Sequence, residues 1–392
     1  MSHRSVVRFL VIAAAAVAAG GAYSIRVDAQ ESSAPAAAAS SPLAVPITFS
    51  GVLFGNFQYS KSPGSENFNK FELERAYLTA IAQAGDKVSI RLTTDVFQQT
   101  SAPSDAYYKG WVIRAKYAYL QYDAFRSASG AALLGRVGIV HTVEIDHEEN
   151  FWPRWIAPTP TDRLGFFSSA DGGTAGLLTL PRKLGQLYAT ITNGPGYASR
   201  ETDRFKDYAA RLSLTPFGAL HNSLKALDLT AWYYKGALAS KFVNGGAGQL
   251  GPVGSGLQRD RWGLFAALEN PAFTVTAEMA QRMEQGETGA NTAASPRAVV
   301  DSTGRVTSGS VYVRPLRLLS AKSASPLGVI FRIDQYKPNI AAAGSSQFVV
   351  GGLTWDLSKR ASFALDYQEQ TAKSGVALPV SKMYYLHWVA SF

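Results

Sequence analysis

From Ile47 to the last residue, apolar and polar side chains alternate along one segment after another. In residues 88–97, for example, Val88, Ile90 and Leu92 alternate with Ser89 and Arg91. Successive side chains of a β-strand point to opposite faces, so each such segment has one apolar and one polar face. A chain in which this period recurs throughout is expected to be all-β.

The pattern predicts sixteen strands: 47–60, 70–82, 88–97, 111–125, 131–142, 170–180, 185–194, 205–214, 224–237, 258–268, 273–284, 306–319, 327–337, 346–357, 361–370 and 381–392. Connections after even-numbered strands are short, those after odd-numbered strands are longer, and residues 143–169 form the longest. Short and long connections therefore lie at opposite ends of the strands. An even strand number with short periplasmic turns and long outer loops is typical of transmembrane antiparallel β-barrels.

A soluble β-sandwich or propeller would show the same alternation, with its apolar faces in the core. The predicted strands are long, however, and a tilted strand crosses a membrane in roughly ten residues. Aromatic residues also gather near the expected strand ends, as interfacial girdles require. They are Tyr117, Tyr119, Tyr233, Trp355, Tyr384 and Trp388. Both features favour the membrane barrel.

The C-terminal segment gives a third indication. Every second residue back from the terminal Phe392 is apolar or aromatic: Ala390, Trp388, Leu386 and Tyr384. An amphipathic last strand that ends in Phe resembles the assembly signal of bacterial outer-membrane barrels. We therefore expect the barrel assembly machinery and outer-membrane lipid among the partners of the chain.

The N-terminus predicts secretion. Arg4 and Arg8 precede an apolar run over residues 9–19, and small residues up to Ala29 offer a cleavage site, with residues 22–24 as a second candidate. This order is that of a signal peptide, here 1–29, and an uncleaved membrane anchor is the alternative. Residues 30–46 are rich in Ala, Ser and Pro and predict a flexible periplasmic tail. The barrel then spans 47–392.

Composition excludes several other classes. The chain has no Cys, which excludes disulfide scaffolds and Cys-ligated zinc. It is 46% hydrophobic and only 17% charged, unlike a disordered protein. Lys and Arg outnumber Asp and Glu by 38 to 29, but no basic run exceeds two residues. A nucleic-acid binder concentrates its basic residues, so no nucleic-acid partner is expected.

Two segments carry family-like motifs. Residues 71–76 read Phe-Glu-Leu-Glu-Arg-Ala, and a turn with Gly85 and a strand ending at Asp95 follow. Residues 192–197 read Thr-Asn-Gly-Pro-Gly-Tyr, and another strand follows Lys206. Both segments resemble the phosphate-selective porin O/P family of bacterial outer membranes. The resemblance implies a trimeric, sixteen-stranded porin in the outer membrane of a Gram-negative bacterium, with a constriction loop folded into the lumen.

If the apolar faces meet lipid, the alternate positions face the lumen, which suits charged side chains. The predicted pore-lining residues are Arg75, Arg91, Arg114, Lys116, Arg136, Arg211, Arg282 and Arg332. Acidic residues share these faces: Asp95, Asp207, Asp228, Glu278, Asp334 and Asp366. The small positive excess predicts passive diffusion of hydrophilic solutes with a weak anion preference. Because the arginine fork suits phosphate or carboxylate, selective anion binding remains an alternative.

Residues 143–169 are the expected constriction loop, with Arg154, Trp155 and Arg163 as its site residues. Five acidic residues give this segment a net charge of −3, and it contains no Lys. Phosphate-binding members of the family are expected to concentrate lysines here, so the segment departs from the pattern. Its aromatic cluster, residues 151–155, suits either packing against the barrel wall or stacking on a ring-shaped solute.

Other chemistry finds little support in the sequence. His141 and His147, with Glu144 and Asp146, have a spacing that suits a divalent ion, and a polar loop root is the alternative interpretation. No Gly-x-Ser-x-Gly motif occurs, and neither an enzyme nor a cofactor is expected. The alternative of another class is a non-conducting barrel that acts as a receptor or adhesin through its long loops.

Overall fold

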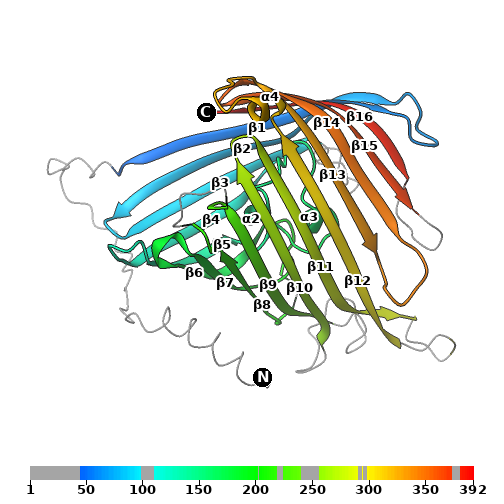
Figure 1. The fold of residues 1–392 in the computed structure, drawn as a ribbon. Helices are drawn as coiled ribbons and strands as arrows, with labels where there is room; N and C mark the ends of the chain where they lie inside the picture. The colour runs from blue at the N-terminus through cyan, green and yellow to red at the C-terminus, as the bar shows by residue number, and fades with distance from the viewer. Residues whose placement is uncertain are drawn as a thin grey trace, which may run out of the picture.

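The computed structural model describes residues 45–98, 110–201, 203–218, 224–239, 256–289, 294, 298–372 and 380–392. Within these residues, sixteen strands form a closed antiparallel barrel (Figure 1). Each strand pairs with its neighbours in the sequence, and β1 closes the barrel against β16. The predicted signal peptide and nearly all of the predicted tail lie outside the described residues.

The strands follow the alternating segments of the sequence. Their bounds are β1 Ile47–Ser60, β2 Asn69–Gly85, β3 Val88–Gln98, β4 Trp111–Arg126, β5 Ala132–His141, β6 Ala170–Thr179, β7 Gly185–Thr192, β8 Asp207–Leu214, β9 Leu227–Ala239, β10 Gly256–Asn270, β11 Phe273–Thr288, β12 Ala298–Val313, β13 Leu327–Lys337, β14 Ser346–Ser358, β15 Ala361–Ala372 and β16 Ser381–Ser391. The prediction of a sixteen-stranded antiparallel barrel is confirmed.

One predicted strand, 306–319, is wrong in its position. β12 begins earlier, at Ala298, and pairs with an extended β11 as far as Thr288. It ends at Val313, and Pro315–Leu319 forms the short helix α4 instead of strand. Proline has no N–H for a strand ladder, and its fixed φ suits the first turn of a helix.

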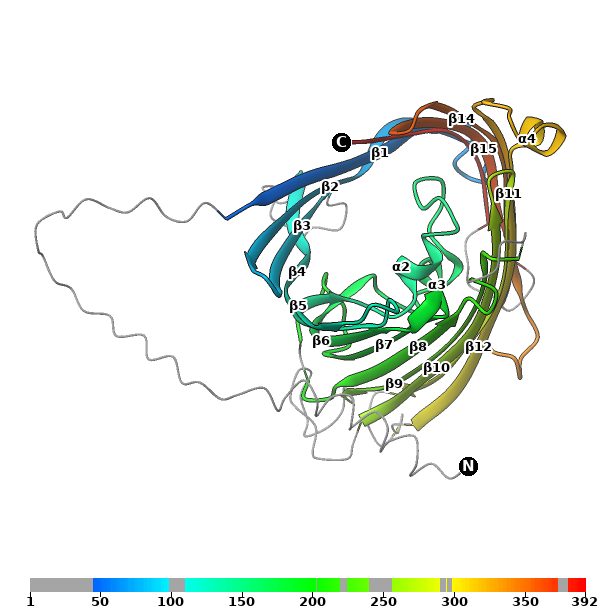
Figure 2. The same ribbon diagram turned by 60° about the vertical axis from the view of Figure 1, so that its left-hand side comes forward.

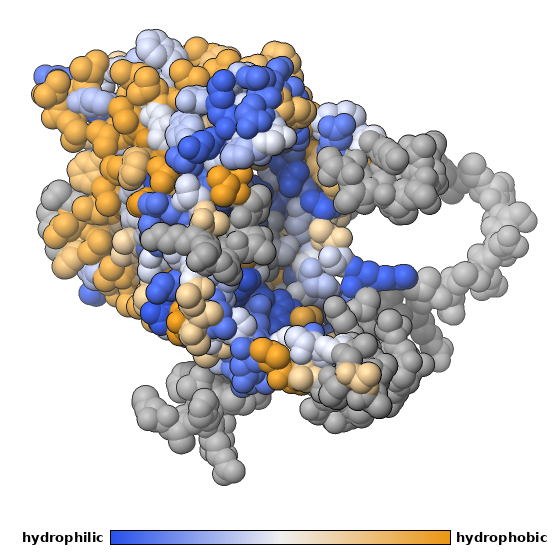
Figure 3. Space-filling view, turned by 90° about the vertical axis from the view of Figure 1, so that its right-hand side faces the viewer, coloured by the Kyte–Doolittle hydropathy of each residue, from blue (hydrophilic) through white to orange (hydrophobic). Residues whose placement is uncertain are grey.

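The strands turn apolar side chains outward and polar side chains inward. Large apolar residues are exposed on the outer surface, among them Leu92, Leu229, Leu264, Leu353, Leu365 and Leu386. Residues at alternate positions are buried and polar, among them Asp95, Asp228, Arg332, Asp334, Asp366 and His387. Figure 3 shows hydrophobic residues gathered at the left of the view and hydrophilic residues in the hollow near its centre. Such an exposed apolar surface suits lipid and not water.

The expected aromatic girdle is correct only in part. Tyr233, Trp355 and Tyr384 are exposed on the outer surface, but Tyr117 and Tyr119 are buried inside the barrel. A β-bulge between β3 and β4 leaves one residue of β4 without a partner, because Thr93 pairs with Tyr117 and Thr94 with Ala115. The extra residue reverses the phase of the strand, so that the alternation beyond it turns the tyrosines inward.

The long connection between β5 and β6 folds into the barrel (Figure 2). We call residues 143–169 the inner loop. It contains two one-turn helices, α2 (Ile145–Glu148) and α3 (Pro160–Arg163). The hydroxyl of Thr159 accepts a hydrogen bond from the Asp162 amide and caps α3. In the described part of the chain, no helix has the length and apolar character needed to cross a membrane.

The last residue takes part in the closure of the barrel. The amide of Gly51 donates to the carbonyl of Phe392 at 3.1 Å, and the amide of Phe392 donates to Gly51 at 3.0 Å. A Cβ atom at position 51 would lie 2.3 Å from the Phe392 ring, so glycine makes room for this ring. Three of the predicted assembly-signal side chains, Tyr384, Leu386 and Phe392, are exposed on the outer surface, and Trp388 is half-buried.

Candidate pore constriction

Basic and amide side chains of the barrel wall hold the inner loop by its backbone. They donate hydrogen bonds to carbonyl oxygens at five points along the loop. The pairs are Arg211–Val143 at 2.5 Å, Arg332–Pro158 at 2.7 Å, Gln368–Ile156 at 2.8 Å, Arg282–Leu164 at 3.1 Å and Arg261–Phe166. These donors come from β8, β10, β11, β13 and β15, so the loop is fixed to a wide arc of the wall.

Three of the predicted pore-lining residues therefore bind the inner loop: Arg211, Arg282 and Arg332. Arg211 and Arg332 are buried, and Arg282 also donates to the Tyr336 hydroxyl at 2.5 Å. A strand pattern shows the face on which a side chain lies, but it does not show what fills the space in front of it. We therefore assign these three arginines to the support of the loop.

Two of these anchors, Arg261 and Gln368, are absent from the sequence-based candidates. Arg261 shares its strand face with Gly263, Phe265 and Ala267, which are all buried. Small and apolar residues also occur on lipid-facing strand faces, so alternation alone does not assign Arg261 to the lumen. The signal that could have revealed Arg261 is the pair Arg259 and Arg261 at a spacing of two on the same strand.

The predicted site residues of the inner loop contact either the barrel wall or other residues of the loop. Arg163 donates to Asp334 at 3.0 Å and to Gln370 at 2.8 Å, so it binds the wall. Arg154 pairs with Glu149 at 3.2 Å and with Asp162, both within the loop. Trp155 lies edge-on to the His387 ring, with 6.4 Å between the centroids. In the same cluster Trp152 is buried under the Arg332 guanidinium, and this contact favours packing against the wall over solute stacking.

The two histidines have separate partners. His141 lies 2.8 Å from Asp146, and His147 lies 3.1 Å from Asp228. Burial lowers the pKa of His147, although Asp228 opposes the shift. Among the described residues, no group of His, Asp and Glu side chains is arranged to hold a metal ion. The polar loop root is therefore the interpretation that these contacts favour.

Buried carboxyl groups reduce the negative charge of the inner loop. Glu144 and Glu148 are fully buried, next to Glu278 of β11. Burial, and then the neighbouring Glu148 carboxylate, raises the pKa of Glu144 well above its usual value, and burial also raises the pKa of Glu148. Both side chains hold their protons to higher pH than exposed glutamates do. The loop is thus less negative than its count of charged residues suggests.

Glu149 titrates near neutrality. Burial raises its pKa to about 7, although Arg154 and Lys116 oppose the shift. Asp146 behaves differently: burial opposes its ionisation, but His141 and further hydrogen bonds hold its pKa below the usual value. Asp146 thus ionises more readily than an exposed aspartate, whereas Glu149 changes charge close to neutral pH.

The other predicted cations lie on β2 to β5, and none of them donates to an inner-loop carbonyl among the described contacts. They are Arg75, Arg91, Arg114, Lys116 and Arg136. Arg114 lies 2.8 Å from Asp95, and Arg75 lies 3.6 Å from the same carboxylate. The Tyr117 hydroxyl of β4 donates to Asp146 at 2.7 Å, so this wall reaches the acidic side of the loop.

Several of these cations lie over aromatic rings. The Lys116 ammonium lies 4.3 Å from the centre of the Tyr77 ring, and the guanidinium groups of Arg91 and Arg136 each lie 5.0 Å from a tyrosine ring. A cation over an aromatic face is attracted by the ring quadrupole and keeps its charge. The same wall also carries carboxyl groups: Asp95 pairs with Arg75 and Arg114, and Glu72 and Glu74 of β2 accept hydrogen bonds from side chains of β1. Its excess of positive charge is therefore small.

Solved structures of other proteins share this architecture. OmpF of Salmonella typhi, in a complex with daunomycin, aligns with a TM-score of 0.60 at 11% identity, over 88% of this chain and 97% of that chain. An anion-selective porin from Comamonas acidovorans aligns with a TM-score of 0.56 at 11% identity, over 89% and 100%. The chain has the fold of these porins. A loop-deleted OmpT of Vibrio cholerae aligns similarly, with a TM-score of 0.57 at 10% identity, over 89% and 100%. No protein-family profile and no curated protein sequence matches the chain.

Proposed function

We propose that this protein is a porin of the Gram-negative outer membrane, through which small hydrophilic solutes and ions diffuse passively. The observation that carries the proposal is the barrel itself, with an apolar outer surface and a charged interior. A strand wall of this kind leaves a polar lumen in which ions are stable. The similarity to porin structures supports the same function.

The charges of the barrel wall and of the inner loop support a weak anion preference. Residues of β2 to β5 contribute five cations, of which Lys116 is buried. Asp95 is shared by two of them, and Glu72 and Glu74 of β2 bind side chains of β1. The loop opposite contributes Asp146, Glu149 and Asp162, and Arg154 pairs with the last two. Charged side chains that line a narrow passage select ions of the opposite sign. We therefore propose that the inner loop is the constriction and that the basic wall makes it mildly anion-selective.

Phosphate selectivity is the narrower function that the sequence motifs suggest. Arginine forks on the basic wall suit phosphate, since they donate parallel hydrogen bonds. The inner loop, however, contains no Lys, and its arginines are bound to acidic partners. The proposal is accordingly a general anion preference, of which phosphate transport would be one case.

Assembly and location belong to the same proposal. Residues 1–29 would direct secretion, and the last strand, with Phe392, would be recognised by the barrel assembly machinery. The apolar outer band would contact outer-membrane lipid. A trimer is proposed because the structural neighbours include an outer-membrane protein of Vibrio cholerae in trimer form, aligned with a TM-score of 0.54.

Bilayer recording tests the channel function. Purified full-length protein in a planar bilayer should give stepwise conductance in KCl. Arg91→Gln with Arg136→Gln should lower the anion preference, because both side chains belong to the basic wall. Arg305→Gln, at an exposed position, is the matched control and should leave it unchanged. Folded protein without conductance would reject the porin and leave the receptor or adhesin alternative.

A further inference from the structure

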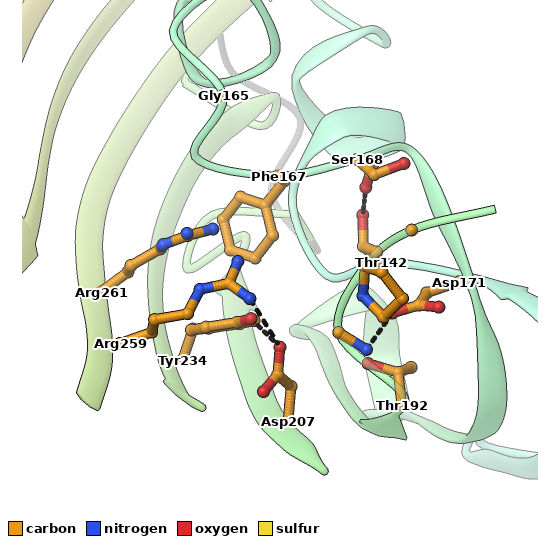
Figure 4. Close-up of a pocket in the computed structure, with 13 residues that line it drawn as sticks. Thr142, Gly165, Phe167, Ser168, Asp171, Thr192, Asp207, Tyr234, Arg259 and Arg261 are labelled. Carbon is orange, nitrogen blue, oxygen red and sulfur yellow. Dashed lines mark hydrogen bonds and ion pairs between the residues drawn. The ribbon is translucent and has the colours of Figure 1, made fainter. Parts of the chain in front are cut away.

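A cavity of about 230 Å³ lies between the end of the inner loop and the ends of β6 to β10 (Figure 4). Phe167 and Ser168 of the inner loop form one side of it. Asp207, Tyr234 and Arg259 of the barrel wall also line it, and the Phe167 ring lies edge-on to Tyr234, with 5.6 Å between the centroids. None of the lining residues belongs to the basic wall of β2 to β5, so this cavity is separate from the proposed anion-selective passage.

The Asn-Gly-Pro-Gly segment noted in the sequence builds part of the cavity wall. Gly194 and Gly196 have φ values of +115° and +81°, which side chains rarely allow. A Cβ atom at Gly194 would lie 2.5 Å from Asp207, and one at Gly196 would lie 2.6 Å from Ser168. Glycine at both positions lets this segment lie against the cavity without filling it.

Most polar groups around the cavity already have partners. The Asp171 carboxylate accepts hydrogen bonds from the amides of Gly172 at 2.7 Å and Gly194 at 2.6 Å. Asp207 accepts one from the Tyr234 hydroxyl. Arg261 donates to Glu284 and to the Phe166 carbonyl. These contacts position the groups but leave them little capacity for a ligand.

Arg259 is the exception. Its side chain is only 13% exposed and lies 3.7 Å from Asp207, the one ion pair it forms with a described residue. Its guanidinium donates no hydrogen bond to any described residue. Arg259 is thus half-buried, and its guanidinium also lies 5.8 Å from the centre of the Tyr234 ring. A guanidinium has five N–H donors, so a half-buried one without hydrogen-bond acceptors beside a cavity is suited to bind an anion.

We propose that the cavity binds a small monocarboxylate, with the carboxylate on Arg259 and the body of the molecule against the Phe167 ring. The arginine fork matches a carboxylate in a bidentate arrangement. Arg261 pairs with Glu284, and Asp171 and Asp207 also line the cavity, so a second negative charge on the ligand would meet carboxylates and no free cation. The volume is below that of pockets for drug-sized molecules, which indicates a smaller solute. This saturable site goes beyond passive diffusion.

Calorimetric titration of the detergent-solubilised full chain tests the site, with benzoate as the probe. Benzoate has the carboxylate and a ring for Phe167, and the uncharged benzamide has the same shape. We expect benzoate to bind at least tenfold more tightly than benzamide. Arg259→Gln should weaken benzoate binding at least tenfold, while the exposed-site variant Arg305→Gln should leave it unchanged. Equal benzoate affinity in wild type and Arg259→Gln, or no benzoate binding to wild type, overturns the proposal.

Two further measurements secure the interpretation. Arg259→Gln should keep the heat-modifiable gel mobility of a folded barrel and the unit conductance of wild type, because Arg259 is outside the proposed passage. Inorganic phosphate that displaces benzoate more strongly than acetate does would overturn the assignment to a monoanion. Failure of the channel function would appear as absent conductance in wild type, whereas failure of this site would appear only in the titration.

Discussion

Replacement of Arg332 by Met should release part of the inner loop from the wall. Arg332 is 1% exposed, and it donates to Asp334 at 2.9 and 2.8 Å and to the Pro158 carbonyl at 2.7 Å. The substitution keeps an unbranched side chain but removes all three hydrogen bonds. Asp334 then retains Arg163 at 3.0 Å and Ser308 at 2.7 Å, so its charge is only partly compensated.

The expected magnitude follows from these contacts. Removal of one partner of a buried ion pair costs about 3–5 kcal/mol. Because Arg163 still faces Asp334, we expect the lower end, about 3 kcal/mol. Local detachment of the loop would then become about 100-fold more frequent, since 1.4 kcal/mol is a factor of ten. The other anchors remain, so the barrel should still assemble.

Denaturant unfolding of the refolded barrel in detergent measures this loss, and open-channel noise in a bilayer reports the detachment. Adding Asp334→Asn to Arg332→Met should destabilise the barrel further, because Arg163 then also loses its carboxylate partner. The exposed-site variant Arg305→Met should change stability by less than about 0.5 kcal/mol. An Arg332→Met variant within about 0.5 kcal/mol of wild type, with unchanged noise, would refute this account of the loop.

Two other predictions concern the loop charge and the barrel seam. Because burial raises the pKa of Glu149 to about 7, lowering the pH from 8 to 6 protonates it, removes a negative charge and should increase anion preference. Glu149→Gln should reduce this pH dependence in reversal-potential measurements, and an equal dependence in the variant would contradict the role of Glu149. Deletion of Phe392 removes the backbone hydrogen bonds to Gly51 and should reduce the outer-membrane yield of folded barrel severalfold. Normal yield on a heat-modifiability gel would argue against an assembly role.

The strands were predictable because their signal is local. Burial on one face imposes a period of two, and this period is visible in segments such as 327–337, whose bounds agree with β13. The predicted assignment of side chains to the inner and outer faces is wrong where a strand contains an extra residue. The bulge at Lys116 turns Tyr117 and Tyr119 inward. The helix α4 was missed because apolar residues continue past Pro315, which cannot donate to a ladder.

The inner loop shows why the site was only partly predictable. Alternation predicts that Arg211, Arg282 and Arg332 lie on the polar faces. In the structure, these three side chains donate hydrogen bonds to carbonyls of the inner loop. Such contacts join residues far apart in the chain, and no local pattern encodes them. Arg75, Arg91 and Arg114 donate to no loop carbonyl among the described contacts, and their place in the pore lining stays a prediction.

Ion selectivity in a planar bilayer tests the central proposal most directly. Wild-type protein is recorded at neutral pH under a tenfold KCl gradient, and the reversal potential is read at zero current. The basic wall of β2 to β5, opposite a loop whose negative charge is reduced by burial, predicts a reversal potential of the sign for chloride preference, of modest size. A potential of the opposite sign, or folded protein without conductance, would contradict the account.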